Sequence, residues 1–147
     1  MNYWIASSNR TNWDIILKEL TWGIPKRNKN LQTRTAVGDK LLVFVKQEGQ
    51  ADTIVPSAIT GVFAITEIFE SNTPLFIPPP QMGDEVFPYR FKLKKIHLFN
   101  PPLEFKQLIP DLQFITNKTM WSGHLRTAMR TIPKEDYEFI LKIGDQQ

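Results

Sequence analysis

Two of the four tryptophans, Trp22 and Trp121, stand beside basic or polar turns and not inside apolar runs. An electron-rich ring beside cations is suited to holding a nucleobase, because stacking contributes roughly 1–3 kcal/mol per base while Lys and Arg neutralise phosphate. Core packing is the alternative for any single tryptophan, and we assign it to Trp4 and Trp13. The basic residues expected to contact phosphates are Lys26, Arg27, Lys29, Lys118, Arg126 and Arg130.

Polar side chains near these tryptophans could recognise a base that has left its stack. The amides of Asn30 and Asn117 and the hydroxyl of Ser122 offer donors and acceptors for a base edge. The same residue types commonly cap helices and turns, so both interpretations stay open at the sequence level.

Several classes of chemistry have no support in the sequence. The chain has no cysteine, which excludes disulfides, Cys-based metal sites and thiol nucleophiles. It contains no Gly-rich phosphate loop, HExxH or GxSxG motif. His97 and His124 show no metal-ligand spacing and no tie to a nucleophile. We therefore expect no catalytic residue, no metal and no cofactor.

Charge is distributed unevenly along the 147 residues. The net charge of +3 combines basic segments at residues 1–50 (+4) and 89–134 (+7) with acidic segments at 51–88 (−5) and 135–147 (−3). If the basic segments meet in space, they form a face suited to a polyanion. The alternative is that Lys and Arg simply solvate strand and loop surfaces.

The pattern of apolar residues predicts several strands and few helices. Residues 41–45 are apolar at every position, as in a central strand covered on both faces. Residues 2–6, 58–69 and 89–99 are the other predicted strands, with a bend at Gly61 and a β-bulge at Lys94-Lys95. Ser7-Ser8-Asn9 and Val37-Gly38-Asp39-Lys40 are expected to be turns.

Helices are predicted mainly outside the central strands. One starts at a cap on Thr11 or Asn12 and ends at residue 20, a short one spans 103–109, and one spans 134–143 with Gly144 as its C-cap. Residues 26–30 and the proline-rich segment 73–88 are expected to be loops. Together these elements predict an α+β class, in which a mixed β-barrel has peripheral helices. The length fits one domain over residues 1–147.

A series of short motifs, in order and nearly end to end, resembles the EVE domain family, whose fold is PUA-like and related to YTH domains. The resemblance implies a PUA-like barrel and a non-enzymatic reader of modified bases. The motifs are Tyr3-Trp4-Ile5, Trp22-Gly23-Ile24-Pro25, Gly38-Asp39-Lys40, Pro88-Tyr89-Arg90, Asn117-Lys118, Trp121-Ser122, Ala128-Met129-Arg130, Pro133 and Asp136-Tyr137.

The resemblance also implies positions for site residues. It places Trp22 in the wall of the base pocket and Trp121 with Ser122 on the opposite side, completing a cage. Two positions depart from the family pattern. Phe44 stands where an aromatic hydroxyl often occurs and cannot donate a hydrogen bond to a base, and Arg126 replaces a small residue and adds a phosphate contact. The remaining base-site residues, expected near the mouth or by proximity, are Lys46, Tyr89, Arg90, Asn30 and Phe44.

The sequence thus predicts a module that binds a flipped or single-stranded modified base in DNA or RNA. A pocket for a free nucleotide-like ligand or a protein partner is the alternative. The N-terminus lacks the pattern of a signal peptide and no segment has 18 uninterrupted apolar residues, so we expect a cytoplasmic protein without membrane contact.

Overall fold

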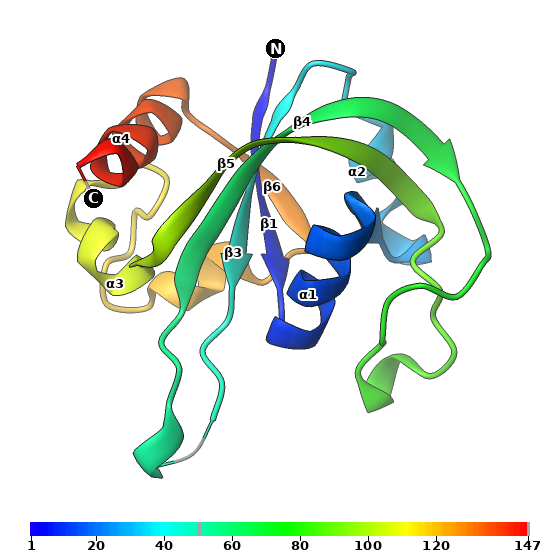
Figure 1. Cartoon of the computed structure of the whole chain (residues 1–147), viewed down its shortest axis with the longest axis horizontal. Coiled ribbons are helices and arrows are strands. Elements are labelled where there is room, and N and C mark those ends of the chain that lie inside the picture. Colours follow the sequence, from blue (N-terminus) through cyan, green and yellow to red (C-terminus); the bar gives the residue numbers. More distant parts are fainter. Residues whose placement is uncertain (50, 147) are drawn as a thin grey trace.

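A curled six-stranded sheet forms the centre of the computed structural model, which describes residues 1–49 and 51–146 (Figure 1). The strand order is β2-β5-β4-β3-β1-β6, so β2 and β6 are the two edges and the sheet is a half-barrel. The pair β1–β3 is parallel and the other neighbouring pairs are antiparallel. The strands are β1 (Tyr3–Ser8), β2 (Thr21–Ile24), β3 (Lys40–Val45), β4 (Ala58–Glu70), β5 (Tyr89–Glu104) and β6 (Met129–Ile132).

The helices lie in two groups around the half-barrel. Figure 1 shows α1 and α2 on one side of the sheet and α3 and α4 on the other. Within the described chain, no helix has the length and apolar character needed to span a membrane. The α-helices are α1 (Arg10–Glu19), α2 (Lys29–Thr33), α3 (Phe105–Leu108) and α4 (Lys134–Asp145), and short 3₁₀ helices cover Lys26–Asn28, Ala51–Thr53, Pro80–Met82, Ile109–Asp111 and Trp121–Leu125.

The central strands bury both of their faces. In β3, Leu42 and Phe44 belong to one apolar cluster, whereas Leu41, Val43 and Val45 belong to the other. This division follows from the strand period of two, which sends successive side chains to opposite faces. The prediction of a central strand at residues 41–45 is confirmed.

Register shifts bend the long strands. β4 shifts its pairing between Ile59 and Gly61, which confirms the bend expected at Gly61. The shift expected at Lys94-Lys95 occurs one position later, between Lys95 and His97. Ile96 is the extra residue and is 45% exposed, because the shift changes which side chains face the core.

Three predictions in the N-terminal third are corrected, and the strand at residues 21–24 was not predicted. Ser7 and Ser8 continue β1 beside β3 and do not form a turn. The first helix begins earlier than expected, because the Asn9 side chain accepts the Asn12 N–H at 2.8 Å and acts as the N-cap. Residues 21–24 are a strand paired with β5, and the expected loop at 26–30 instead forms helical turns of the Lys26–Asn28 segment and α2.

Two further predictions in the C-terminal third are corrected. β5 continues to Glu104, so the helix expected at 103–109 is confined to Phe105–Leu108, whose two end residues are buried. α4 extends to Asp145, which leaves Gly144 inside the helix instead of at its cap. A Cβ at Gly144 would collide with the Phe99 ring, so glycine here permits close helix–sheet packing.

Candidate nucleic-acid interface

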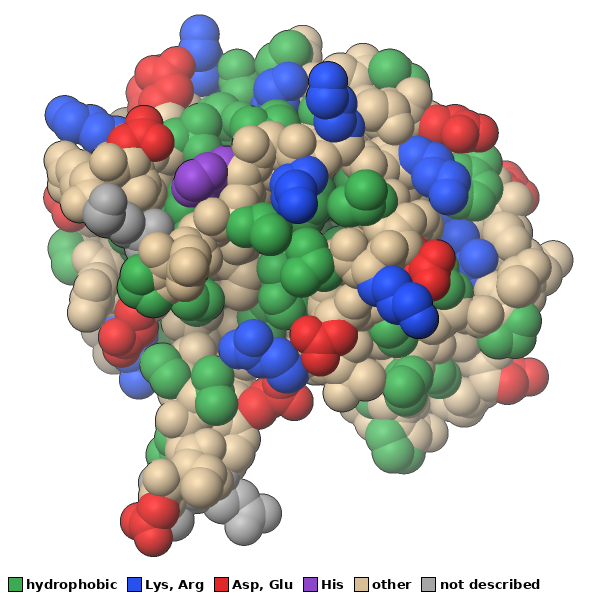
Figure 2. Space-filling model, viewed as in Figure 1, with side chains coloured by type: hydrophobic (Ala, Val, Ile, Leu, Met, Phe, Trp, Pro, Cys, Tyr) green, Lys and Arg blue, Asp and Glu red, His purple; other side chains and the backbone are tan. Residues whose placement is uncertain are grey.

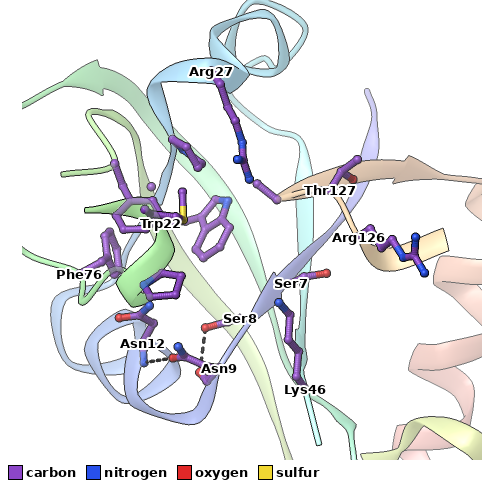
Figure 3. A pocket seen from close by; sticks show the side chains of 16 residues that line it. Ser7, Ser8, Asn9, Asn12, Trp22, Arg27, Lys46, Phe76, Arg126 and Thr127 are labelled. Carbon is purple, nitrogen blue, oxygen red and sulfur yellow. Dashed lines mark hydrogen bonds between the residues drawn. The ribbon is translucent and has the colours of Figure 1, made fainter. Parts of the chain in front are cut away.

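A cavity opens where the two edges of the half-barrel approach each other. Its walls come from the end of β1, the start of α1, β2, the proline-rich segment 73–88 and the residues that lead into β6 (Figure 3). Its volume is about 150 Å³. Cavities of this size accept benzene, so this one is large enough for a single six-membered aromatic ring.

Trp22 provides one wall of this cavity, which we call the Trp22 cavity. The residue is 6% exposed and its Nε1–H is buried with no hydrogen-bond partner among the residues that the structure describes. An unpaired buried donor costs about 1–3 kcal/mol. A ligand that carries a hydrogen-bond acceptor would remove this cost.

The proline-rich segment supplies the apolar side of the Trp22 cavity. The Phe76 ring meets the Trp22 ring edge-on, with centroids 6.2 Å apart, and Met82 and Phe87 also line the cavity. Gly23 makes this approach possible, because a Cβ there would lie 2.8 Å from the Phe76 ring. The absence of a side chain at Gly23, next to Trp22 in β2, therefore leaves the space in which Phe76 packs.

Arg90 holds this loop and does not itself line the Trp22 cavity, whereas the resemblance implied a place near its mouth. The residue is buried, and its guanidinium donates to the carbonyl oxygens of Phe87 (3.1 Å), Val86 (2.9 Å) and Thr73. Burial lowers the pKa of Arg90 from its ordinary value. Its donors are used within the protein, so Arg90 positions Phe87 and the loop.

Polar side chains form the wall opposite the loop. Ser7 and Ser8 reach the Trp22 cavity from the end of β1, with Oγ atoms that donate to the backbone oxygens of Leu125 (3.0 Å) and Asn9 (2.9 Å). Their hydroxyl oxygens keep lone pairs that can accept from a ligand. Asn12 ties α1 to the loop through two hydrogen bonds with Ile77. The sequence interpretation missed these residues, because polar residues at a strand end resemble a turn.

Three cations surround the entrance: Arg27, Lys46 and Arg126 are exposed and line the Trp22 cavity (Figure 3). On the face shown in Figure 2, Lys and Arg are interspersed with Asp and Glu and do not gather in one large patch. The three cations that line the cavity therefore offer local positive potential for an anionic group.

Two of the predicted phosphate contacts serve the fold. Lys118 Nζ donates to the carbonyl oxygens of Ile109 (2.9 Å) and Leu112 (2.6 Å). The Arg130 guanidinium lies 4.9 Å from the centroid of the Phe114 ring, and burial lowers its pKa while Asp136 raises it. Both cations therefore contribute to the fold, and neither lines the Trp22 cavity.

Other predicted site residues lie outside the Trp22 cavity. Tyr89 pairs with Ile24 at the start of β5. Asn117 accepts the Met120 N–H at 3.0 Å, which is the turn role left open by the sequence. Lys26, Lys29 and Asn30 are exposed on the segment that follows β2, and they do not line the cavity.

Trp121 and Ser122 line a neighbouring cavity of about 580 Å³, together with Phe44. We call it the Trp121 cavity. The two cavities share Lys46 and Arg126. Trp22 and Trp121 thus line two adjoining cavities, where the resemblance implied a single cage.

Trp4 and Trp13 occupy the core, as predicted. Trp4 is fully buried and its Nε1 donates to Asp39 Oδ2 at 3.0 Å. Trp13 is buried against Phe63, with ring centroids 6.1 Å apart. Within residues 1–49 and 51–146, no group of three or more His, Cys, Asp and Glu could hold a metal ion.

A family model for the EVE domain matches residues 2–143. The chain belongs to the EVE domain family. A UPF0310 protein of Pyrococcus abyssi is 40% identical to this EVE domain over 149 aligned positions, covering 95% of this chain and 97% of the relative.

Solved structures share the fold of this EVE domain. Human THYN1 in complex with 5-methylcytosine-containing DNA has a TM-score of 0.65 at 11% identity, covering 100% of this chain and 99% of that one. The YTH domain of Zygosaccharomyces rouxii MRB1 in complex with N6-methyladenosine RNA has a TM-score of 0.60 at 16% identity, covering 97% and 86%. These similarities confirm the predicted PUA-like α+β fold.

Proposed function

We propose that this EVE domain binds nucleic acid and takes one modified base, flipped or single-stranded, into the Trp22 cavity. The observation that carries the proposal is the buried Trp22 Nε1–H, which has no partner within the described residues and lies at a cavity large enough for one ring. A base offers both an aromatic ring to pack against the indole and an acceptor atom for its N–H.

The apolar side of the cavity supports selection of a modified base. A methyl group on the base would lie among Phe76, Met82 and Phe87, where burial of one methyl contributes about 0.8 kcal/mol. The ligands named for the two structural neighbours, 5-methylcytosine DNA and N6-methyladenosine RNA, also support this substrate class. Exclusion of ordered water from the apolar wall would add to the preference.

Two features support a reader of nucleic acid in preference to an enzyme. Arg27, Lys46 and Arg126 stand where phosphates next to a bound base would approach. The described lining of the Trp22 cavity includes no carboxylate or imidazole that could serve as a general base for its serine hydroxyls. The absence of cysteine also fits action in the cytoplasm.

The experiment is an affinity measurement with matched single-stranded oligonucleotides, in RNA and DNA, that carry N6-methyladenine, 5-methylcytosine or no modification. Each is titrated at two salt concentrations into the wild-type protein, Trp22→Ala and Trp22→Phe. We expect one modified oligonucleotide to bind more tightly than its unmodified counterpart, with the preference lost in Trp22→Ala. Trp22→Phe keeps a ring but removes the N–H, so its intermediate affinity would report the hydrogen bond.

Trp13→Phe is the matched control, because Trp13 is equally buried but does not line the cavity. Its binding should equal that of the wild type. If binding depends on salt but is the same with and without the modification and in Trp22→Ala, the protein contacts only the phosphate backbone, which would contradict base recognition. Binding of a free nucleotide or a peptide alone, with little dependence on salt, would favour the alternative of a small-molecule or protein-interaction module.

A further inference from the structure

The Trp121 cavity is lined from four parts of the chain: the end of β3 with the residues that follow it, Ser57 just before β4, α3 and the segment from Trp121 to Arg126. Its volume of about 580 Å³ lies within the range of pockets that hold whole small molecules, which is roughly 300–1,000 Å³. It is therefore large enough for a second nucleoside beside the Trp22 cavity.

Trp121 is the aromatic platform of this second cavity. The ring is only partly buried, and it rests on Phe105 at 5.3 Å and meets Phe44 edge-on at 6.3 Å between centroids. Because two buried rings support the indole from behind, its orientation is set before any ligand arrives. A pre-oriented indole beside an open cavity is the arrangement on which a base stacks without much sequence preference.

The cations of the Trp121 cavity link it to the Trp22 cavity. Lys46 and Arg126 line both, while Lys106 lines the second alone. The described lining of the second cavity includes these three cations and no carboxylate. One phosphodiester group joins consecutive nucleosides, so two cations shared by neighbouring cavities stand where such a group would lie.

We infer that the Trp121 cavity binds the nucleoside next to the modified one in the same strand, with the connecting phosphate on Lys46 and Arg126. This inference rests on the proposed function, because the Trp22 cavity must hold the modified base. The second base stacks on Trp121, and Lys106 attracts the backbone beyond it. Ser122 and Gln47, which also line the cavity, offer polar groups to its edge.

The test compares short probes that fill one cavity or both. The probes are N6-methyladenosine 5′-monophosphate and 5-methyl-2′-deoxycytidine 5′-monophosphate, and trinucleotides with the same nucleosides flanked on both sides by uridine or thymidine. Isothermal titration is carried out with the wild type, Trp121→Ala and Lys106→Gln. Lys142→Gln is the matched control, because Lys142 is exposed on α4 and lines neither cavity.

For the wild type we expect a trinucleotide to bind at least about 10-fold more tightly than its monophosphate, as one added stacking contact predicts. The ratio should fall to about 2 or less in Trp121→Ala, decrease about 2- to 5-fold in Lys106→Gln and stay unchanged in Lys142→Gln. The monophosphate should bind all four proteins equally, which also shows that Trp121→Ala is folded.

Two results would overturn the inference while leaving the proposed function intact or undecided by it. If the wild type binds monophosphate and trinucleotide equally, the second cavity takes no nucleoside, although the proposed function stands. If the trinucleotide advantage persists in both Trp121→Ala and Lys106→Gln, the added nucleoside binds elsewhere. If Trp121→Ala loses the monophosphate through unfolding, Lys106→Gln decides. Failure of every probe to bind the wild type would overturn the proposed function as well.

Discussion

Trp4 and Trp22 are buried in the same apolar cluster, yet within the described chain only the indole N–H of Trp4 has a hydrogen-bond acceptor. Trp4 Nε1 donates to Asp39, whose carboxylate also accepts the backbone N–H groups of Asn2 and Ala36, each at 3.0 Å. Trp22 Nε1 has no partner in the described chain and adjoins a cavity. The comparison shows that two equally apolar surroundings can leave an indole N–H paired or unpaired, and the unpaired one marks Trp22 as the residue to test for ligand binding.

The largest expected effect lies on the structural side of this comparison. Asp39→Ala should lower the free energy of unfolding by about 3 kcal/mol, because it leaves three donors, including the buried Trp4 N–H, without their acceptor. Urea unfolding measures the change. Asp111→Ala, which removes an exposed carboxylate, is the control and should change stability by about 0.5 kcal/mol or less. Equal effects of the two substitutions would show that the Trp4 network contributes little.

Arg90 provides the next largest effect, on the loop that completes the Trp22 cavity. Arg90→Met should lower stability by about 2 kcal/mol, because the carbonyl oxygens of Thr73, Val86 and Phe87 lose their donors. Oligonucleotide affinity should fall as well, since the loop carries the apolar wall. Arg27→Met, at the exposed rim, should leave the midpoint of urea unfolding unchanged while weakening binding. If folded Arg90→Met binds the oligonucleotide as tightly as the wild type, the loop does not contribute to ligand binding.

A matched pair of substitutions tests the comparison directly. Trp4→Phe and Trp22→Phe remove the same atoms, but only the first leaves a buried acceptor, on Asp39, without its donor. We expect Trp4→Phe to be less stable than Trp22→Phe by about 1–2 kcal/mol. Conversely, only Trp22→Phe should weaken binding of the modified oligonucleotide, by about 5- to 10-fold, the value of one hydrogen bond. Equal losses of stability in the two variants would contradict the distinction.

The smallest effect on stability is expected at the rim. Arg126→Gln should change the free energy of unfolding by about 0.5 kcal/mol or less, and should reduce the salt dependence of oligonucleotide binding by about one unit in the logarithmic slope. Lys118→Gln is the contrast, because its Nζ serves two carbonyl oxygens of the fold. It should lower stability by about 1 kcal/mol and leave the salt slope unchanged. If Lys118→Gln reduced the salt slope and Arg126→Gln lowered stability, Lys118 would be the phosphate contact and Arg126 the structural cation.

Local patterns were sufficient for much of the fold. The unbroken apolar run at residues 41–45 identified the central strand, and Gly61 identified a bend. Some errors are local, such as the start of α1 and the position of Gly144, but the strand that was missed has a distant pairing partner. Residues 21–24 contain a tryptophan and a glycine after a helix, and only their pairing with β5, about 70 positions away, makes them a strand.

In the candidate site, too, local sequence was sufficient for some residues, while the contacts of others depended on distant parts of the chain. Trp22 could be selected because it stands before a basic turn, and Arg27 and Arg126 because they lie close to Trp22 and Trp121 in the sequence, whereas Lys46 was implied only by the family resemblance. Arg90 and Lys118 have the same charge and similar local surroundings, yet the structure directs them to backbone carbonyl oxygens. Residue type and spacing cannot show which acceptors a long side chain will meet.

The sequence by itself determined that the chain is an α+β protein of alternating apolar strands, that its cations gather in two segments and that Trp22 adjoins one of them, since these properties depend on neighbours within a few positions. Only the tertiary structure decided that Ser7 and Ser8 line the same cavity as Trp22 and that Trp121 lines the adjoining one. A cavity is bounded by segments far apart in the chain, and the curl of the sheet brings them together.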